Sequence, residues 1–555
     1  MPQGITSQYA TDIKAGLTVG VVLVPQAVAY AVLAGMPPVY GLYASLLPLI
    51  VYSLFGSSPH LAVGVNAVDM LLIAGGLTAL ATPGTGEYIG LVALLALVTG
   101  AIQVVMGLLR LGFIVNLLSR PVATGFISGA ALIIALNQFG ALFGVVIPQS
   151  SQVHILLFGL VRHIADVNPF TAVIGMTSII VIVGMKRLRP GYPVGITAAV
   201  LATTATWFFG LDALGVAVVG QLPSGLPWPQ IPQFSTQTVR SILPTAGLLV
   251  LFQFMTVVSL SRSFAGKGGY RVAPNRELTA IGAANIFGGL FQGIPVSGSF
   301  SRTSILYTFG QTTKLANALA AVVVALTLAF FTPLFRFLPE AVLAAIIIVS
   351  ISKLVDWKEA RYLLRVKRSD GLIAVLTFLS TVIFGVVYGI AVGVLASVFA
   401  IMYRISRPKL VTLGHVPGTR SYRDINRYSK AELTEGVVLL RLDASFSFAN
   451  AEFVHDHVLR AAQQDEDIHS VVLDGSGIND LDMTAASVLV DMATTLRKRG
   501  TELYITGLKG AVRDTISGTV LGDKIGKDHL LMTPHRAMTQ IQEHQATKDK
   551  IESDS

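Results

Sequence analysis

Two charged side chains, Asp69 and Arg302, lie within apolar segments of this chain of 555 residues. Only 13% of its residues are charged and 53% are hydrophobic, whereas soluble proteins carry about 25% charged residues. Asp69 is the one acid inside an apolar run among the ten acidic residues before position 408. Because a charge at membrane depth is costly and usually functional, both residues are candidates for binding an ion.

Two short apolar segments begin near Val65 and near Arg302, each after a stretch rich in Gly, Pro and Ser: FGSSPHLAVGVNA and FGGLFQGIPVSGSFSRT. Neither leaves enough residues for a full helical crossing plus a loop. They are the third and the tenth apolar segments, and paired interrupted segments in corresponding positions of two halves indicate a transporter's binding site. The sequence therefore predicts two half-helices, the alternative being loops between ordinary helices.

The N-termini of two facing half-helices would bind an anion. A helix N-terminus carries roughly half a positive charge and several unpaired N–H groups. The candidate donors from the two sides, backbone and hydroxyl groups together, belong to Ser299, Ser301 and Thr303, and to Val65, Asn66 and Ala67.

A third contribution comes from the first apolar segment, where Gln26 and Tyr30 lie one helical turn apart on one face. The amide of Gln26 can donate two hydrogens to an oxyanion. The alternative is a polar side chain that hydrogen-bonds within the helix bundle.

Fourteen apolar segments are candidates for the membrane-spanning helices that would position these residues. They are residues 13–33, 41–56, 65–80, 88–109, 122–143, 170–185, 193–210, 244–261, 278–291, 302–312, 315–332, 340–352, 370–385 and 387–405.

The basic residues fix the expected orientation. Residues 1–408 contain 23 Lys and Arg against 10 Asp and Glu, and basic residues cluster on cytoplasmic loops. With a cytoplasmic N-terminus, the outer loops hold only Arg162, Arg240 and Arg336. We therefore expect a multi-pass protein of the cell's inner (plasma) membrane with both termini inside, and a basic balance that reflects topology and not nucleic-acid binding. Residues 1–11 lack the features of a cleaved signal peptide, so the first apolar run should be retained.

Several functions are disfavoured by composition. The chain has no cysteine, which excludes thiolate metal sites and cysteine catalysis. It contains no HExxH, GxSxG or paired-carboxylate motif, and its ten histidines are scattered. We expect neither an enzyme nor a bound metal or cofactor.

The composition changes after residue 408. VVLLRLDASFSF, HSVVLDGS and ELYITG have the pattern of strands, and AEFVHDHVLRAAQQ, MTAASVLVDMATTLRKRG and HRAMTQIQEHQ that of amphipathic helices. The alternation predicts a small α/β domain over residues 409–545 with a partly parallel sheet. The polar tail, residues 546–555, is expected to be disordered.

Long motifs resemble the SulP family of sulfate permeases: Val24–Ser58, Arg110–Gln138 and Asn275–Leu315. The segments Ser445–Val454 and Val471–Leu489 resemble the family's STAS domain. The resemblance implies a 7+7 inverted repeat, with spans 1–4 and 8–11 as a core domain and spans 5–7 and 12–14 as a gate domain. It also implies that the anion sits between half-helices 3 and 10, that Arg302 supplies the positive charge, that Gln26 faces the substrate, and that the core moves like an elevator. The alternative for Arg302 is a helix-end arginine that reaches toward water.

The STAS-like domain departs from its relatives at one position. In anti-sigma-factor antagonists, which it resembles, a helix begins with Asp-Ser and the serine is phosphorylated; here the residues are Asp482, Met483 and Thr484. Thr484 is expected to be a helix cap. We interpret the domain as an interaction and dimerisation module, which favours a homodimer.

The membrane part departs from the family at two linked places. Thr256 stands where sulfate permeases carry a carboxylate in span 8 that resembles a proton-coupling group. In span 3, Asp69 stands where relatives often have Ser or Thr. Our hypothesis is that Asp69 has taken over the coupling role, with Arg302 nearby to favour its charged form. The alternative is a structural carboxylate paired with Arg302 or Asn66.

The sequence thus predicts a secondary-active transporter of an inorganic anion, sulfate first, coupled to a proton or sodium gradient. Bicarbonate or dicarboxylate transport would use the same site design. An uncoupled anion channel or exchanger is the alternative from another class, because it needs no titrating group.

Overall fold

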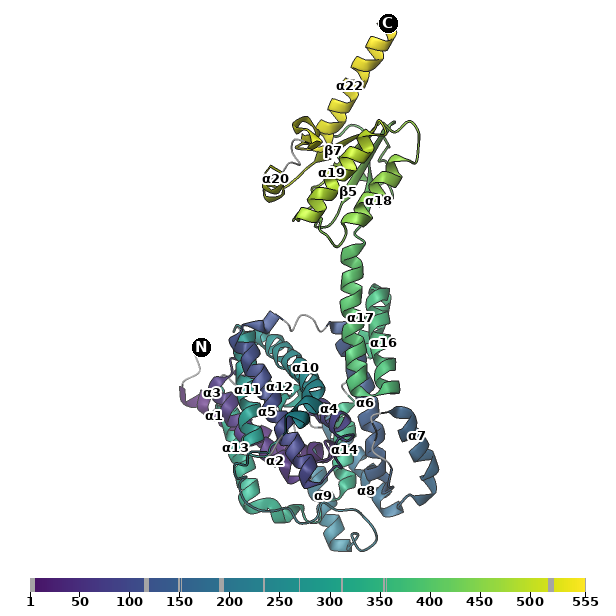
Figure 1. Ribbon diagram of the computed structural model, residues 1–555. Helices are drawn as coiled ribbons and strands as arrows, with labels where there is room; N and C mark the ends of the chain where they lie inside the picture. Colours follow the sequence, from purple (N-terminus) through teal and green to yellow (C-terminus); the bar gives the residue numbers. More distant parts are fainter. Residues whose placement is uncertain are drawn as a thin grey trace. The chain divides into compact units, whose positions relative to one another are not determined.

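The computed structural model contains two compact units, residues 1–397 and 398–555, which are described separately (Figure 1). The structure describes residues 5–113, 119–147, 150, 152–188, 194–232, 235–268, 270–310, 313–352, 355, 357–517 and 524–554. The boundary between the units falls inside helix α17 (Val386–Ser406), before residue 408. This helix continues to the end of the last apolar run of the sequence.

The first unit is helical apart from two short strands. Its first half contains α1 (Ile5–Leu33), α2 (Val39–Ala44), α3 (Leu47–Phe55), β1 (Val63–Gly64), α4 (Ala67–Leu77), α5 (Gly86–Leu108), α6 (Arg120–Phe143), α7 (Val153–Arg162), α8 (Pro169–Leu188) and α9 (Val194–Phe209). Its second half contains α10 (Thr236–Gly268), α11 (Pro274–Leu290), β2 (Ser297–Gly298), α12 (Phe300–Thr308), α13 (Leu315–Leu326), α14 (Glu340–Ile351), α15 (Trp357–Val366), α16 (Arg368–Phe384) and α17.

Each of the fourteen apolar segments overlaps a helix of the structure. Seven helices of the described chain are long and apolar enough to cross a membrane, α13 together with the turns that extend it to Phe335 among them. The fourteen-span count and the inverted repeat stay predictions. Two helices of the first unit were not foreseen: α7, and α15, which is short, amphipathic and without a buried residue.

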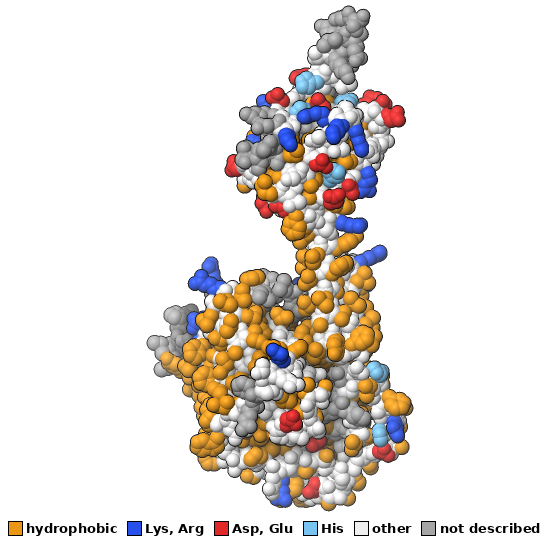
Figure 2. Space-filling model, viewed as in Figure 1, with side chains coloured by type: hydrophobic (Ala, Val, Ile, Leu, Met, Phe, Trp, Pro, Cys, Tyr) orange, Lys and Arg blue, Asp and Glu red, His pale blue; other side chains and the backbone are white. Residues whose placement is uncertain are grey.

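The helices of the first unit pack in two groups. In one group, α1 packs on α13 and α11 lies between α3 and α5, with α10 against α4 and α5. In the other, α6 packs on α14 and α16, and α8 packs on α9 and α14. The groups meet where α1 contacts α14 and α9 and where α4 contacts α6. Figure 2 shows apolar side chains covering much of the visible face of this unit, as a membrane protein requires.

The second unit is an α/β domain with a six-stranded sheet of order β4-β3-β5-β6-β7-β8. Strands β5 (Val437–Leu442), β6 (Ser470–Asp474), β7 (Glu502–Thr506) and β8 (Leu530–Leu531) are parallel, while β3 (Leu410–His415) is antiparallel to β4 (Tyr422–Asp424) and β5. The predicted partly parallel sheet is confirmed. Helices α18 (Ala451–Ala462) and α19 (Met483–Arg497) cover one face, and α22 (Pro534–Asp554) packs on the other; α20 (Gly510–Ser517) follows β7.

Two expectations for this domain need correction. Asp482, not Thr484, caps α19: its carboxylate accepts hydrogen bonds from the N–H of Ala485 at 2.8 Å and of Phe448 at 2.7 Å. A carboxylate is a stronger acceptor here than a hydroxyl because it also carries charge at the helix N-terminus. The tail expected to be disordered continues α22 to Asp554, because no Gly or Pro follows Pro534 to end the helix; Ser555 lies outside the described residues.

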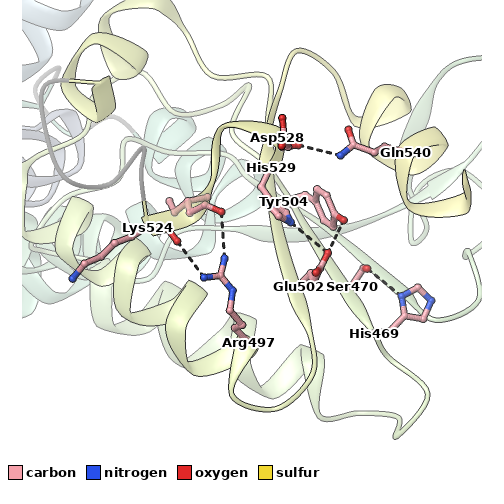
Figure 3. Close-up of polar contacts among 10 residues, drawn as sticks. His469, Ser470, Arg497, Glu502, Tyr504, Lys524, Asp528, His529 and Gln540 are labelled. Carbon is pink, nitrogen blue, oxygen red and sulfur yellow. Dashed lines mark hydrogen bonds and ion pairs between the residues drawn. The ribbon is translucent and has the colours of Figure 1, made fainter. Parts of the chain in front are cut away.

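A polar cluster joins the start of β7 to the segment before α22 (Figure 3). Oε2 of Glu502 accepts the hydroxyl of Tyr504 at 2.8 Å and lies 3.3 Å from Nε2 of His529. Burial alone would raise the pKa of Glu502, but these hydrogen bonds and the nearby charge of His529 and His544 together lower it.

The close crossing of α5 and α11 predicts a position that tolerates no side chain. A Cβ on Gly100 would lie 2.5 Å from the carbonyl oxygen of Gly282, whereas a Cβ on Gly90 of the same helix would meet nothing within 4 Å. Gly100→Ala should lower the thermal unfolding temperature of the full chain because the helix backbones must separate, at a cost of roughly 1–3 kcal/mol. The matched Gly90→Ala variant should be neutral or slightly stabilising; equal effects of the two would contradict the packing argument.

The lowered pKa of Glu502 predicts a pH-dependent contribution to stability. A carboxylate whose folded pKa lies below its ordinary value stabilises the fold above the ordinary pKa and loses this contribution as pH falls through the lowered value. Glu502→Gln should therefore increase amide hydrogen exchange of β7 at neutral pH in the full-length protein and flatten its pH dependence. The exposed Glu435→Gln change serves as control and should leave both unchanged.

Candidate functional site

The two half-helices predicted from the sequence begin side by side at a two-stranded antiparallel ribbon. Val63 of β1 pairs with Gly298 of β2, and Gly64 pairs with Ser297. The N–H of Ser299 donates to the carbonyl of Ala62 at 2.9 Å, which extends the pairing. Because α4 follows β1 and α12 follows β2, the ribbon brings the N-termini of both half-helices together.

Asn66 shapes the start of α4. Its side-chain oxygen accepts hydrogen bonds from the N–H groups of Val68 and Asp69, both at 3.0 Å, and so caps the helix. For the N–H groups of Asn66 and Ala67, the described part of the chain shows no acceptor. Val65 and Ala67 are buried. Two backbone donors at this terminus therefore remain available to a bound anion.

Arg302 joins three elements from inside the protein. Its side chain starts on α12 and is fully buried. Its Nη2 donates to the carbonyl of Val65 at 2.9 Å, and Nη1 donates to Oε1 of Gln26 on α1 at 3.2 Å. Its Nε has no hydrogen-bond partner among the described residues, and no carboxylate of that part of the chain forms an ion pair with it. The alternative of an arginine reaching out to water is wrong, because the guanidinium is turned inward.

Gly64 makes room for this guanidinium. Its φ is +144°, a backbone conformation that favours glycine, and a Cβ at this position would lie 3.0 Å from Nη2 of Arg302. The glycine of the ribbon is therefore required both by the backbone and by the arginine.

The remaining predicted donors have different surroundings. The hydroxyl of Thr303 accepts the N–H of Ala62 at 3.0 Å, so Thr303 ties α12 to the segment before β1. Ser299 is buried and Ser301 is exposed. Tyr30 lies near Arg302 and Ser350 of α14, at the meeting of the two helix groups. The structure thus gathers Gln26, Tyr30 and Arg302, while Ser301 faces away from the buried part.

Asp69 is fully buried in the first turn of α4, but it is not the ion-pair partner of Arg302. One carboxylate oxygen, Oδ2, accepts hydrogen bonds from Ser297 at 2.6 Å, Asn66 at 2.9 Å and Gln253 at 3.2 Å. The other oxygen, Oδ1, has no hydrogen-bond partner among the described residues. The alternative pairing with Arg302 is wrong, because the guanidinium donates to the carbonyl of Val65, directly after β1, and to Gln26 of α1. The pairing with Asn66 is confirmed.

On α10, the residue that contacts Asp69 is Gln253 and not Thr256, to which the family resemblance pointed. Thr256 is half-buried, and no hydrogen bond of its side chain is seen in the described chain, whereas Gln253, three residues earlier, reaches Asp69. Oε1 of Gln253 accepts the amides of Gln103 and Asn285, each at 3.0 Å. Polar residues inside apolar spans were the signal that would have pointed to this buried network.

Asp69 is the one acid inside an apolar run of the sequence, but other acids of the first unit are buried too. Asp12 and Glu277 are also fully buried. Glu277 accepts the hydroxyl of Tyr52 at 2.7 Å and the N–H groups of Ser57 and Ser58 at 2.9 and 3.0 Å. Glu277 therefore holds the segment between α3 and β1 in place. The hydropathy pattern did not mark Glu277 as a buried acid, because α11 is not uniformly apolar.

A cavity of about 360 Å³ is lined by residues of both helix groups. Residues of α1, α4, α6 and α14 line it, and the carboxylate-bearing residue among them is Glu340 at the start of α14. The amides of Asn137 and Gln138 and the hydroxyl of Thr78 provide further polar groups. Glu340 does not stand out in the sequence, because it lies at the edge of an apolar segment and not within it.

Comparisons with known proteins give the family of this fold. The model of the sulfate permease family matches residues 9–377, and that of the STAS domain matches residues 428–537. A probable sulfate transporter of Mycobacterium tuberculosis (strain CDC 1551 / Oshkosh) is 36% identical over 527 residues, which cover 94% of this chain and 93% of the relative.

Two solved structures are similar to this chain. The murine Solute Carrier 26 family member A9 anion transporter, in the inward-facing state, matches with a TM-score of 0.90 and 25% identity over 97% of this chain and 92% of that chain. The transmembrane domain of the cyanobacterial bicarbonate transporter BicA matches with a TM-score of 0.61 and 24% identity over 70% of this chain and 97% of that chain. On its sequence and its fold, the chain belongs to the sulfate permease family of membrane-spanning transporters and ends in a STAS domain.

Proposed function

We propose that this protein transports an inorganic oxyanion, sulfate first, and that the anion binds between the N-termini of α4 and α12. The observation that carries the proposal is the buried guanidinium of Arg302, whose two hydrogen-bond acceptors are neutral oxygens. An uncompensated buried charge costs several kcal/mol. A bound anion would supply the missing negative charge.

The donor set suits an oxyanion. Arg302 offers the unpartnered Nε, and the starts of the two half-helices offer N–H groups with the positive ends of two helix dipoles. Gln26 holds the guanidinium through its oxygen, which leaves its amide hydrogens for the anion. Ser299 and Tyr30 add hydroxyl groups at the edge of the site. Such fixed donors replace the hydration shell of the ion without selecting strongly between tetrahedral and trigonal oxyanions.

Asp69 is proposed to couple the anion to a proton or a sodium ion. An ionised carboxylate in the first turn of α4 opposes a second negative charge at the same helix N-terminus. A cation on Asp69 removes this repulsion, and the unpartnered Oδ1 offers it an acceptor. Asn66 links the two events, because it donates to Asp69 and caps the helix that faces the anion. Thr256 takes no part in this scheme; Gln253 orients the carboxylate instead.

Transport is proposed to move one helix group against the other. The group that contains α1, α3, α4, α5 and α10–α13 carries all the site residues, and the group of α6, α8, α9, α14 and α16 would form the gate. Tyr30 and the Glu340 cavity lie where the groups meet. The buried charge is expected to stay within its own helix group while the boundary between the groups slides.

Orientation, location and assembly are proposed from the pattern of residues in the sequence. The basic residues favour a cytoplasmic N-terminus and STAS domain in the inner (plasma) membrane. A homodimer is proposed with the STAS domain as an interaction module. Bicarbonate is the second candidate substrate, favoured by the similarity to the bicarbonate transporter BicA.

The proposal predicts that Arg302 is required for anion uptake. Arg302→Gln should lower the initial rate of radiolabelled sulfate uptake into proteoliposomes at least tenfold, because it removes the full positive charge that Arg302 brings to the site. Arg302→Lys should recover part of the rate, and the exposed Arg240→Gln change should have no effect. Wild-type uptake in the Arg302→Gln variant would refute the site; a preference of the wild type for bicarbonate in the same assay would reassign the substrate.

The coupling role predicts the behaviour of Asp69→Asn. Sulfate–sulfate exchange should persist, while accumulation driven by an imposed proton or sodium gradient should be lost, because an amide keeps the hydrogen bonds of the site but neither protonates nor binds the cation as a carboxylate does. The exposed Glu87→Gln change is the matched control. Gradient-driven accumulation that survives in Asp69→Asn would contradict the hypothesis. Failure of the wild type to accumulate sulfate under any gradient would instead favour the channel or exchanger.

A further inference from the structure

A second cavity of about 430 Å³ lies at one end of the first helix group, where α3 and α5 end and α11 begins. Two arginines line it: Arg110, directly after α5, and Arg276, in the first turn of α11. The side-chain oxygen of Asn275 accepts the N–H of Gly112 at 2.7 Å, which ties the residues after α5 to the start of α11. The fold therefore brings together two arginines that are far apart in the sequence.

The charge of this cavity is not balanced by the protein. No acidic residue lines it, and neither arginine forms an ion pair within the described chain. Nε of Arg276 donates to the carbonyl of Phe55 at 2.9 Å, which fixes the guanidinium and leaves its two terminal nitrogens. Lys314 lies close enough to Arg276 to feel its charge. The buried acid nearest in sequence, Glu277, is occupied by Tyr52, Ser57 and Ser58.

Arg110 has an unusual backbone conformation. Its φ is +58°, one of two positive values among the non-glycine residues of the described chain. It ends α5 in the left-handed region, where glycine is the usual residue and a side chain costs roughly 1–2 kcal/mol. An arginine that strains the backbone at a position suited to glycine indicates a functional role for its side chain.

The rim of the cavity distinguishes between possible anions. Leu54, Phe55 and Leu108 line it and expose 67%, 53% and 71% of their surface, and Leu109 and Phe113 next to it are equally exposed. Free phosphate or a transported oxyanion has no apolar part to cover these side chains. A phospholipid has both an anionic headgroup and acyl chains, as this arrangement requires.

We propose that this cavity binds the headgroup of an anionic phospholipid, with the phosphate on Arg110 and Arg276 and the acyl chains along Leu54, Phe55 and Leu108. The site lies apart from the α4–α12 site and does not depend on the proposed transport function. Because α11 carries Glu277, which holds the segment before β1, the lipid would brace one end of the helix group that contains the anion site.

Native mass spectrometry of the full-length protein in detergent tests the proposal with phosphatidylglycerol and phosphatidylcholine as probes. The wild type should retain phosphatidylglycerol in preference to phosphatidylcholine. Arg110→Gly should reduce this retention about tenfold while leaving the unfolding temperature unchanged or raised, because glycine relieves the backbone strain but removes the guanidinium. Arg110→Lys should keep part of the binding, and the exposed Arg262→Gln change is the control.

Two results would overturn the proposal. Equal retention of phosphatidylglycerol by the wild type and Arg110→Gly would show that the arginine does not hold the headgroup. Displacement of the lipid by inorganic phosphate at an equal concentration would show that the cavity is a site for small soluble anions. Arg276→Gln is a second variant, expected to lose binding as well, and its folding is checked by its unfolding temperature.

Discussion

The buried guanidinium of Arg302 is the group whose position constrains the rest of the site. It reaches from α12 across the ribbon to Val65 and on to Gln26 of α1, so three elements from distant parts of the chain must stay in register. The ribbon supplies that register through two residue pairs and the additional bond from Ser299 to Ala62. Gly64 must lack a side chain, because the guanidinium occupies the space that a Cβ would need. Thr303, Ala62 and Glu277 then serve to hold the strand segments that carry these contacts.

Separation of Asp69 from Arg302 changes how the two charges work together. A direct ion pair would neutralise the arginine and leave no attraction for an anion. Instead, neutral amides and hydroxyls surround Asp69, and neutral oxygens surround Arg302. In the proposed mechanism, Arg302 therefore attracts an anion and Asp69 attracts a cation. Asn66 stands between them in the hydrogen-bond network, since it caps α4 and donates to Asp69.

Sequence patterns predicted the parts of this site that follow from local rules. Interrupted apolar segments predicted the half-helices, and alternating hydrophobicity predicted β5, β6 and β7 of the STAS domain. Apart from Asn66, the partners of Asp69 could not be predicted in this way, because Gln253 and Ser297 are 184 and 228 residues away along the chain. Counting from a family motif pointed to Thr256, one helical turn from the residue that makes the contact. The direction in which a polar side chain points depends on helix rotation, which hydropathy does not determine.

In the proposed mechanism, the charges of Arg302 and Asp69 also constrain the stoichiometry of transport. With Arg302 and Asp69 both ionised, the empty site is neutral, and a neutral site crosses a low-dielectric boundary at the lowest cost. A monovalent anion with one cation on Asp69 restores neutrality, since each added charge meets its opposite. Divalent sulfate with the same single cation leaves one excess negative charge, so its movement would respond to the membrane potential. Bicarbonate with one cation would not. The same pair of residues therefore makes the two candidate substrates electrically distinguishable.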